Sequence, residues 1–185
     1  MRLVMLGGTG SGKGTQTAKL CDLYQIPSIS MGNILRDGIT SGTELGKQAQ
    51  SYVEKGDLVP DQLIIQFIKE RLLTSDVKNG WILEGYPRTA FQAEELDFLL
   101  KKLEQKLDWA IYLKVSDAIM KERALSRALS DDTPEVIERR LATFKKSTIP
   151  LLEYYQYCNR LLTIDGKQSP EQVAAAISQQ LKLDK

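Results

Sequence analysis

A run of closely spaced glycines near the start of the chain constrains its fold more than any other feature. Residues 7–15 read GGTGSGKGT and contain the spacing GxxxxGK, between a short apolar stretch and a helical pattern. Such glycines let successive backbone N–H groups turn toward one point, and the helix that follows adds its positive end. Lys13 adds a full positive charge beside them. The sequence therefore predicts a strand, a phosphate-binding loop and a helix, in that order.

The rest of the chain alternates between short apolar runs and longer patterns with helical periodicity. This alternation predicts an α/β fold, a doubly wound five-stranded parallel sheet with helices on both faces. Ligands of such sheets bind at the carboxyl ends of the strands. Residues 30–56 break the pattern because glycines punctuate short helical pieces, and we expect a small mobile excursion there. The strands are predicted at residues 3–6, 26–29, 81–83, 109–115 and 161–164.

Several helix starts are marked by side chains that can accept a free backbone N–H. Asp61 and Ser116 are predicted N-caps, and Thr133 is a third, with a proline and an acid directly after it. Pro150 predicts a kink or a break in the helix that starts at Thr133. Two capping boxes are predicted, Thr89 with Gln92 and Ser169 with Gln172.

The composition excludes several classes of protein and site. With 185 residues, of which 42% are hydrophobic, the chain is expected to form one globular domain. Its net charge of +1 argues against a dedicated nucleic-acid binder, and no apolar run is long enough to span a membrane. The absence of histidine excludes histidine bases and metal ligands. Cys21 and Cys158 are far apart and predict two reduced, buried thiols in a cytosolic protein.

Further motifs follow the loop in order and cover nearly the whole chain. They are residues 29–36 (ISMGNILR), 56–61 (GDLVPD), 80–89 (GWILEGYPRT) with Gln92, 122–127 (ERALSR), 131–141 (DDTPEVIERRL) and 164–166 (IDG). Together with the loop they resemble the nucleoside monophosphate kinases, and above all the adenylate kinases of the short-lid type. The resemblance implies a single P-loop kinase domain over residues 1–185, with an NMP-binding segment at 30–59 and a short lid at 126–132.

The resemblance implies a phosphotransferase that moves the γ-phosphoryl group of ATP to AMP, in the reversible, Mg²⁺-dependent reaction ATP + AMP = 2 ADP. ATP, AMP and ADP are then the partners, and a cytoplasmic monomer that binds neither nucleic acid nor membrane is expected. Zinc is not expected, because the short lid leaves no room for a metal-binding insertion. Phosphoryl transfer needs phosphates that are held in line, neutralised and shielded from water. Planar, permanently charged guanidinium groups suit this task, and arginines stand at positions 36, 88, 123, 127 and 140.

The resemblance also assigns roles to individual residues. The expected catalytic residues are Lys13, Arg88, Arg127 and Arg140. The expected ATP-binding residues are Gly10, Ser11, Gly12, Lys13, Gly14, Thr15, Arg123, Arg127, Gly166 and Gln168. The expected AMP-binding residues are Met31, Arg36, Asp57, Leu58, Val59, Gly85, Tyr86, Pro87, Arg88, Gln92 and Arg140. Two acids are expected to anchor the lid, Asp131 and Asp132, and one is expected to hold magnesium through water, Glu84.

Some of these residues also have a purely structural interpretation. Gln92 is a capping-box partner of Thr89, whether or not it touches a base. Arg123 and Arg127 are four residues apart, and such a pair often forms a solvated helix face.

Five positions depart from the family pattern. Thr9 replaces a proline, Met31 a threonine beside the base, Asn33 an aspartate, Glu84 an aspartate that ends the third strand, and Leu129 an arginine of the lid. Each charged hydrogen bond lost in this way costs about 1.5–3 kcal/mol of transition-state stabilisation. Two alternatives therefore stay open: a kinase for another nucleoside monophosphate, and a low-turnover nucleotide-binding or sensor protein of the same fold.

Overall fold

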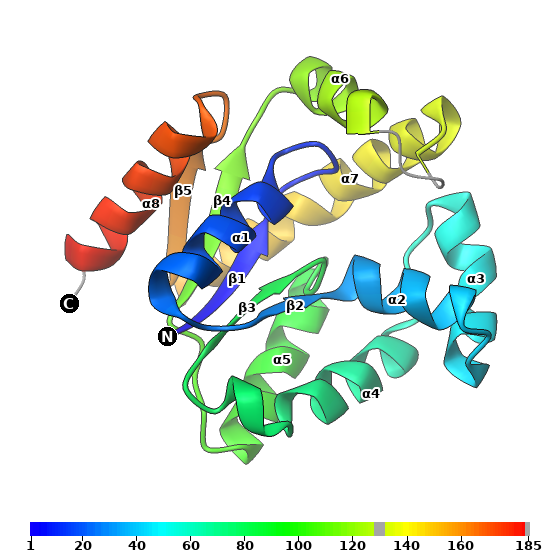
Figure 1. The fold of residues 1–185 in the computed structure, drawn as a ribbon, viewed down its shortest axis with the longest axis horizontal. Coiled ribbons are helices and arrows are strands. Elements are labelled where there is room, and N and C mark those ends of the chain that lie inside the picture. The colour runs from blue at the N-terminus through cyan, green and yellow to red at the C-terminus, as the bar shows by residue number, and fades with distance from the viewer. Residues whose placement is uncertain (128–131, 184–185) are drawn as a thin grey trace.

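The strands lie side by side and all run in the same direction. The computed structural model describes residues 1–127 and 132–183, and within these ranges the sheet has five strands in the order β2-β3-β1-β4-β5 (Figure 1). Every pairing is parallel, which confirms the predicted sheet. The strands are β1 (Arg2–Leu6), β2 (Ser28–Ser30), β3 (Trp81–Glu84), β4 (Trp109–Lys114) and β5 (Leu161–Asp165).

Helices cover both faces of this sheet. In β1, Leu3 and Met5 belong to one core cluster, and Val4 and Leu6 belong to the other. Because both faces are covered, the strands read as continuous apolar runs instead of alternating patterns. The helices of the first cluster are α1 (Lys13–Tyr24) and α8 (Pro170–Leu183). Those of the second include α4 (Asp61–Leu72), α5 (Ala90–Lys102) and α7 (Pro134–Tyr157).

A helical hairpin leaves the sheet between β2 and α4. It consists of α2 (Met31–Thr40) and α3 (Glu44–Lys55), and it projects beyond the carboxyl end of the sheet (Figure 1). A Cβ on Gly46 would lie 2.1 Å from the carbonyl oxygen of Gly38, so the two helices approach each other where only glycine fits. The excursion predicted at residues 30–56 is therefore this hairpin.

Two smaller elements complete the fold. The 3-10 helix η1 (Ser75–Val77) follows α4, and α6 (Asp117–Arg127) follows β4. α6 packs on the first half of α7, where Met120 and Ala124 form a small buried cluster with Ile137 and Leu141. Among the described residues, no helix has both the length and the apolar character needed to cross a bilayer.

Two predicted helix starts are confirmed. The Thr133 hydroxyl accepts the N–H of Val136 at the start of α7, and Ser169 and Gln172 form the reciprocal bonds of a capping box. The helix does not break at Pro150, because the apolar residues beyond the proline still pack against the sheet.

Two other predicted caps need correction. Asp61 is the first residue of α4 and not its cap; its carboxylate accepts a hydrogen bond from the side chain of Gln92 instead. Thr89 accepts the N–H of Gln92 as predicted, but the Gln92 side chain accepts the N–H of Arg88 in place of that of Thr89. Only half of this capping box is therefore formed.

The second strand begins two residues later than predicted. The N–H of Ile26 bonds to the carbonyl of Cys21 at the end of α1, and Pro27 has no N–H, so pairing with β3 starts at Ser28. Cys21 and Cys158 are free thiols, but both are only half-buried, so their predicted burial is wrong.

Candidate active site

The glycine loop lies where the sequence predicts it, between β1 and α1 at the carboxyl end of the central strand. Gly10 and Gly12 have φ angles of 77° and 94°, which favour glycine. A Cβ on Gly10 would also lie 1.9 Å from the carbonyl oxygen of Met120 in α6. The loop therefore passes so close to α6 that glycine is required at this position.

Lys13 reaches back from the first turn of α1 across the loop. Its Nζ donates to the carbonyl oxygens of Gly7 at 2.7 Å and Gly8 at 2.9 Å. Burial lowers the pKa of Lys13 to about 8; the carboxylate of Glu84 opposes this shift, and two nearby arginines reinforce it. A phosphate beside Nζ would favour the charged form and raise the pKa again.

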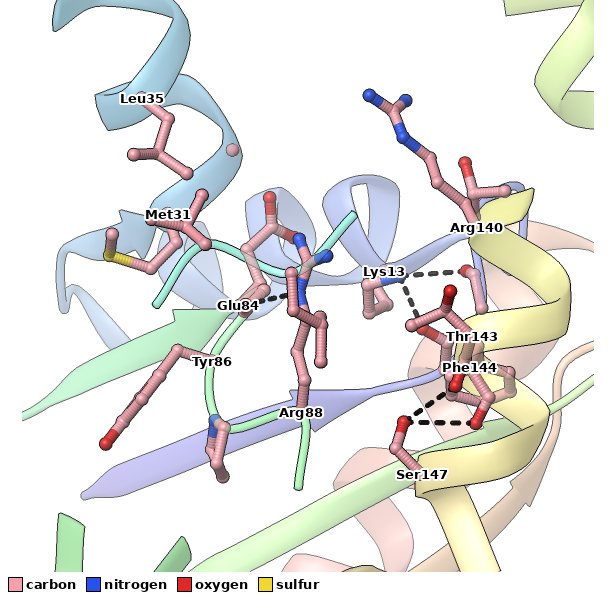
Figure 2. A pocket seen from close by; sticks show the side chains of 18 of the residues that line it. Lys13, Met31, Leu35, Glu84, Tyr86, Arg88, Arg140, Thr143, Phe144 and Ser147 are labelled. Atoms are coloured by element: carbon pink, nitrogen blue, oxygen red, sulfur yellow. Dashed lines mark hydrogen bonds between the residues drawn. The ribbon is translucent and has the colours of Figure 1, made fainter. Parts of the chain in front are cut away.

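A pocket opens beside this lysine, at the carboxyl ends of β1 and β3 (Figure 2). Its walls come mainly from the glycine loop, the α2–α3 hairpin, the segments after α3 and β3, and α7, and α4, α5 and α6 contribute one residue each. Among the described residues, Asp57 and Glu84 are the acids that line it. The cations outnumber them, so the pocket attracts anions such as phosphates. The cations are Lys13, Arg36, Arg88, Arg127 and Arg140.

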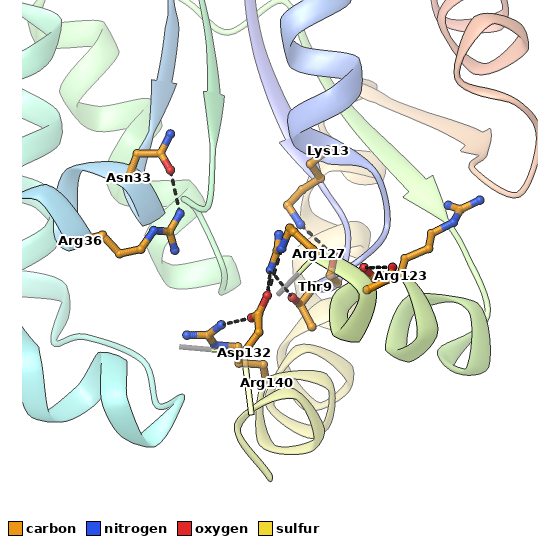
Figure 3. Close-up of polar contacts among 10 residues, drawn as sticks. Thr9, Lys13, Asn33, Arg36, Arg123, Arg127, Asp132 and Arg140 are labelled. Carbon is orange, nitrogen blue, oxygen red and sulfur yellow. Dashed lines mark hydrogen bonds and ion pairs between the residues drawn. The ribbon is translucent and has the colours of Figure 1, made fainter. Parts of the chain in front are cut away.

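Two of these arginines meet at one carboxylate (Figure 3). Arg127 donates from Nε at 3.0 Å and Nη2 at 2.8 Å to Oδ2 of Asp132, and Arg140 donates to Oδ1 at 3.0 Å. The Asp132 side chain is fully buried. Arg127 also donates to the hydroxyl of Thr9 at 3.3 Å, so the threonine that departs from the family pattern supplies a contact that proline lacks. These bonds hold both guanidinium groups beside the loop.

Arg36 and Arg88 are held by other partners. Arg88 donates from Nε to the carbonyl of Gly85 at 2.9 Å. Although Arg88 is open to solvent, the walls of the pocket remove part of its hydration, and this desolvation, followed by the charge of Arg140, lowers its pKa to about 10. It is therefore charged at neutral pH. Arg36 donates to the side-chain oxygen of Asn33 at 2.7 Å.

The other half of the pocket is apolar and contains one buried amide. Gln92 is 3% exposed, and both ends of its side-chain amide are bonded. Oε1 accepts the N–H of Arg88 at 2.7 Å, and Nε2 donates to Asp61 at 2.5 Å. This environment suits a flat heterocycle with a polar edge. The apolar wall consists of Met31, Leu35, Val53, Val59 and Ile64.

The predicted AMP-binding residues all line this one pocket, although they come from five separate parts of the chain. Some of the predicted ATP-binding residues line this pocket, and the others lie outside it. Lys13 and Arg127 line the pocket, whereas Arg123 lies one turn before Arg127 in α6 and donates to the carbonyl of Gly166 at 3.0 Å. Gln168 is exposed in the turn after β5. The remaining members, in the loop and the first turn of α1, are Gly10, Ser11, Gly12, Gly14 and Thr15.

Glu84 ends β3 beside the start of α1. Its Oε2 accepts a hydrogen bond from the Thr17 hydroxyl at 3.3 Å, and a Cβ on Gly14 would lie 3.9 Å from the same oxygen. Among the described residues, no group of three or more His, Cys, Asp or Glu side chains could hold a metal ion. Glu84 is thus a carboxylate beside the glycine loop that belongs to no such group of described residues. This donor set fits Mg²⁺, which keeps several waters and binds through one or two carboxylates plus substrate phosphates.

One wall of the pocket was not predicted from the sequence. The side chains of Thr143, Phe144, Ser147 and Leu151 line it from α7, and Figure 2 shows the first three beside Lys13 and Arg88. They follow Arg140 at helical spacing, so the periodicity of α7 is the signal that could have identified them. Leu129 and Asp131 lie outside the described residues.

Known proteins resemble this chain over nearly its full length. A sequence model of the adenylate kinase family matches residues 5–160. Adenylate kinase 2 of Nostoc sp. is 59% identical over 177 residues, which cover 96% of each chain. Adenylate kinase 2 of Synechocystis sp. is 56% identical over 177 residues, covering 96% of this chain and 98% of the relative. An adenylate kinase of Bifidobacterium longum is 43% identical over 186 residues, covering 98% of this chain and all of the relative.

Proposed function

This chain belongs to the adenylate kinase family, and we propose that its pocket binds AMP beside ATP for the reversible reaction ATP + AMP = 2 ADP. One observation carries the proposal: a single pocket combines five cations with an apolar wall and a buried amide. The cations match the phosphates of two nucleotides, and the apolar half with its amide matches a base. To catalyse phosphoryl transfer, a protein mainly has to position the phosphates and neutralise their charge.

We assign the ATP phosphates to the glycine loop. Backbone N–H groups of residues 10–15 turn around them, and Nζ of Lys13 leaves the carbonyls of Gly7 and Gly8 to bind the β- and γ-phosphates. Arg123 and the backbone at Gly166 and Gln168 are assigned to the ATP base, because the bond between Arg123 and Gly166 brings α6 against the turn after β5.

We assign AMP to the pocket. Arg36 and Arg88 bind its phosphate, and Arg127 and Arg140 surround the group in transfer. The base lies against Met31 and Val59, with the backbone of residues 57–59 and the Gln92 amide at its polar edge. Gly85, Tyr86 and Pro87 complete the wall beneath it.

Mg²⁺ is expected to enter with ATP and to neutralise charge that develops on the phosphate oxygens. Glu84 is the residue that would hold it, through water, from the end of β3. Thr17 orients this carboxylate by donating to Oε2.

Residues 30–59 act in this proposal as the NMP-binding segment, and residues 126–132 act as a short lid anchored by Asp131 and Asp132. Their closure would remove water from the phosphates, which strengthens every charge interaction at the site. We further expect a cytoplasmic monomer without nucleic-acid or membrane partners, in keeping with a net charge of +1.

A coupled assay that measures ADP formation from ATP with AMP, CMP, UMP or GMP tests the proposal and its alternatives. AMP should give the highest kcat/KM, and turnover should require Mg²⁺. A higher kcat/KM for another monophosphate would indicate a different kinase. Tight binding of ATP and AMP without turnover would indicate a nucleotide-binding or sensor protein.

A further inference from the structure

Gln92 is fixed at each of its four polar atoms. Its backbone N–H donates to the hydroxyl of Thr89 at 3.2 Å, and its carbonyl accepts from the hydroxyl of Tyr86 at 3.1 Å. In the side chain, Oε1 accepts the backbone N–H of Arg88 at 2.7 Å, and Nε2 donates to Oδ1 of Asp61 at 2.5 Å. With 3% of its surface exposed, this residue can neither rotate away nor exchange these partners for water.

The two side-chain partners permit only one orientation of the amide. A backbone N–H can only donate a hydrogen bond, and an ionised carboxylate can only accept one. If the amide turned over, its NH₂ group would face the N–H of Arg88, and its oxygen would face the carboxylate of Asp61. Both contacts would become repulsive in a buried site, where unpaired polar groups are costly.

The amide keeps one hydrogen and one lone pair after these bonds, because its nitrogen carries two hydrogens and its oxygen two lone pairs. Gln92 lines the pocket, so these remaining groups are available to a ligand. Adenine presents an acceptor at N1 and a donor at its 6-amino group. Hypoxanthine presents the reverse, a donor at N1–H and an acceptor at O6. When the arginines hold the phosphate of the nucleotide, the base can approach the amide in only one position. The fixed amide then matches the edge of adenine or that of hypoxanthine, but not both.

We propose that Asp61 sets the base specificity of this enzyme by holding the Gln92 amide in the orientation that matches adenine and rejects 6-oxopurines. The inference rests on the proposed function, since that function places the AMP base against Gln92. Asp61 is a positioning residue, because it acts through Gln92. It begins α4, yet its carboxylate is directed across 31 residues of sequence to Nε2 instead of to an N–H of its own helix.

The test compares AMP with inosine monophosphate (IMP), which differs from AMP only at this edge of the base. In Asp61→Asn, an amide replaces the carboxylate and can face either atom of Gln92, so the turned amide is no longer repelled at residue 61 and is opposed only by the N–H of Arg88. We expect the wild-type protein to prefer AMP, and Asp61→Asn to reduce the AMP/IMP ratio of kcat/KM by about tenfold or more. The change should lie mainly in KM for the monophosphate.

Glu171→Gln is the matched control, because it also neutralises a carboxylate in the first turn of a helix, here α8. It should leave the AMP/IMP ratio unchanged, and melting curves should show both variants folded. Asp61→Ser, whose hydroxyl can also donate or accept, serves if Asp61→Asn does not fold. A ratio that stays within twofold of wild type in the folded variant would overturn the proposal and leave Asp61 as a helix-start acid.

Calorimetric titration of the same proteins with AMP and IMP, without ATP, separates this inference from the proposed function. If the wild-type protein does not turn over AMP, the proposed function fails, and the ratio of dissociation constants still tests the role of Asp61. Equal binding of AMP and IMP by the wild-type protein would overturn the inference even if AMP is a good substrate.

Discussion

In the proposed function, the two ends of the site recognise their ligands with different parts of the chain. At the glycine loop, recognition depends on backbone groups and on long, partly exposed cations such as Arg127, whose side chain is 45% exposed. At the base end of the pocket, it depends on one buried side chain, Gln92, with a partner at every polar atom.

The difference follows from what each end must distinguish. A phosphate is a compact anion that accepts hydrogen bonds from every side, so converging N–H groups and charges bind it in many geometries. A base is recognised by the order of donors and acceptors along one edge. A site can reject the wrong order only if its own groups are buried and cannot turn. The proposed function therefore gives the phosphates to adaptable groups and the base to fixed groups.

The largest effect is expected from Lys13→Ala, which removes the charge that we assign to the ATP phosphates. Turnover should fall by about a thousandfold, because the missing charge acts where the transition state is most negative. The fold should survive, since the partners of Nζ among the described residues are carbonyls of the loop and not core groups. Steady-state kinetics and a melting curve measure the two quantities. A collapsed fold would show that Lys13 is structural.

Two glycines of the loop should differ sharply in their tolerance of a side chain. Gly10→Ala places a Cβ against the backbone of α6 and should lower the free energy of unfolding by about 2–4 kcal/mol. Gly12→Ala meets nothing within 4 Å and carries only the cost of its positive φ, about 1–2 kcal/mol. Urea denaturation of both variants checks the order. Equal losses would mean that contact with α6 is unimportant.

The pH dependence should separate the two ends of the site. Lys13 has a pKa of about 8, so it loses its charge as the pH rises above that value in the free enzyme. We expect kcat/KM for ATP to fall about tenfold per pH unit above pH 8, while kcat persists to higher pH because bound phosphates keep the lysine charged. Arg88, with a pKa of about 10, should keep AMP binding nearly constant up to pH 9. Parallel losses for both nucleotides would contradict this separation.

The smallest effect is expected from two helix caps of similar geometry. Thr89→Ala and Ser169→Ala each remove a hydroxyl that accepts a backbone N–H, and each should cost about 1 kcal/mol of stability. Of these two residues, Thr89 is the one that bonds to Gln92, so its loss alone should raise KM for AMP, by about twofold to fivefold. Thermal melts and initial rates provide both values. A KM for AMP that rises equally in both variants would show that the effect is general destabilisation.

Local signals in the sequence account for most of the fold. The glycine loop, the apolar strands and the caps at Thr133 and Ser169 each depend on residues within a few positions of one another, and each lies where the pattern predicts. The errors are also instructive. β2 is shifted because Pro27 has no N–H to donate to β3, and the helix continues through Pro150 because its apolar face remains packed.

All residues that the family resemblance predicts to bind AMP line one pocket, but the resemblance did not predict which partners hold them. The bond between Gln92 and Asp61 and the shared carboxylate of Asp132 join residues whose spacing carries no signal of contact. Packing of α4 against α5, and of α6 against α7, brings these groups together. The sequence by itself determined which chemical groups are present and which elements carry them. Only the tertiary structure decided which donor meets which acceptor, because a hydrogen bond depends on a few tenths of an ångström between elements that are distant along the chain.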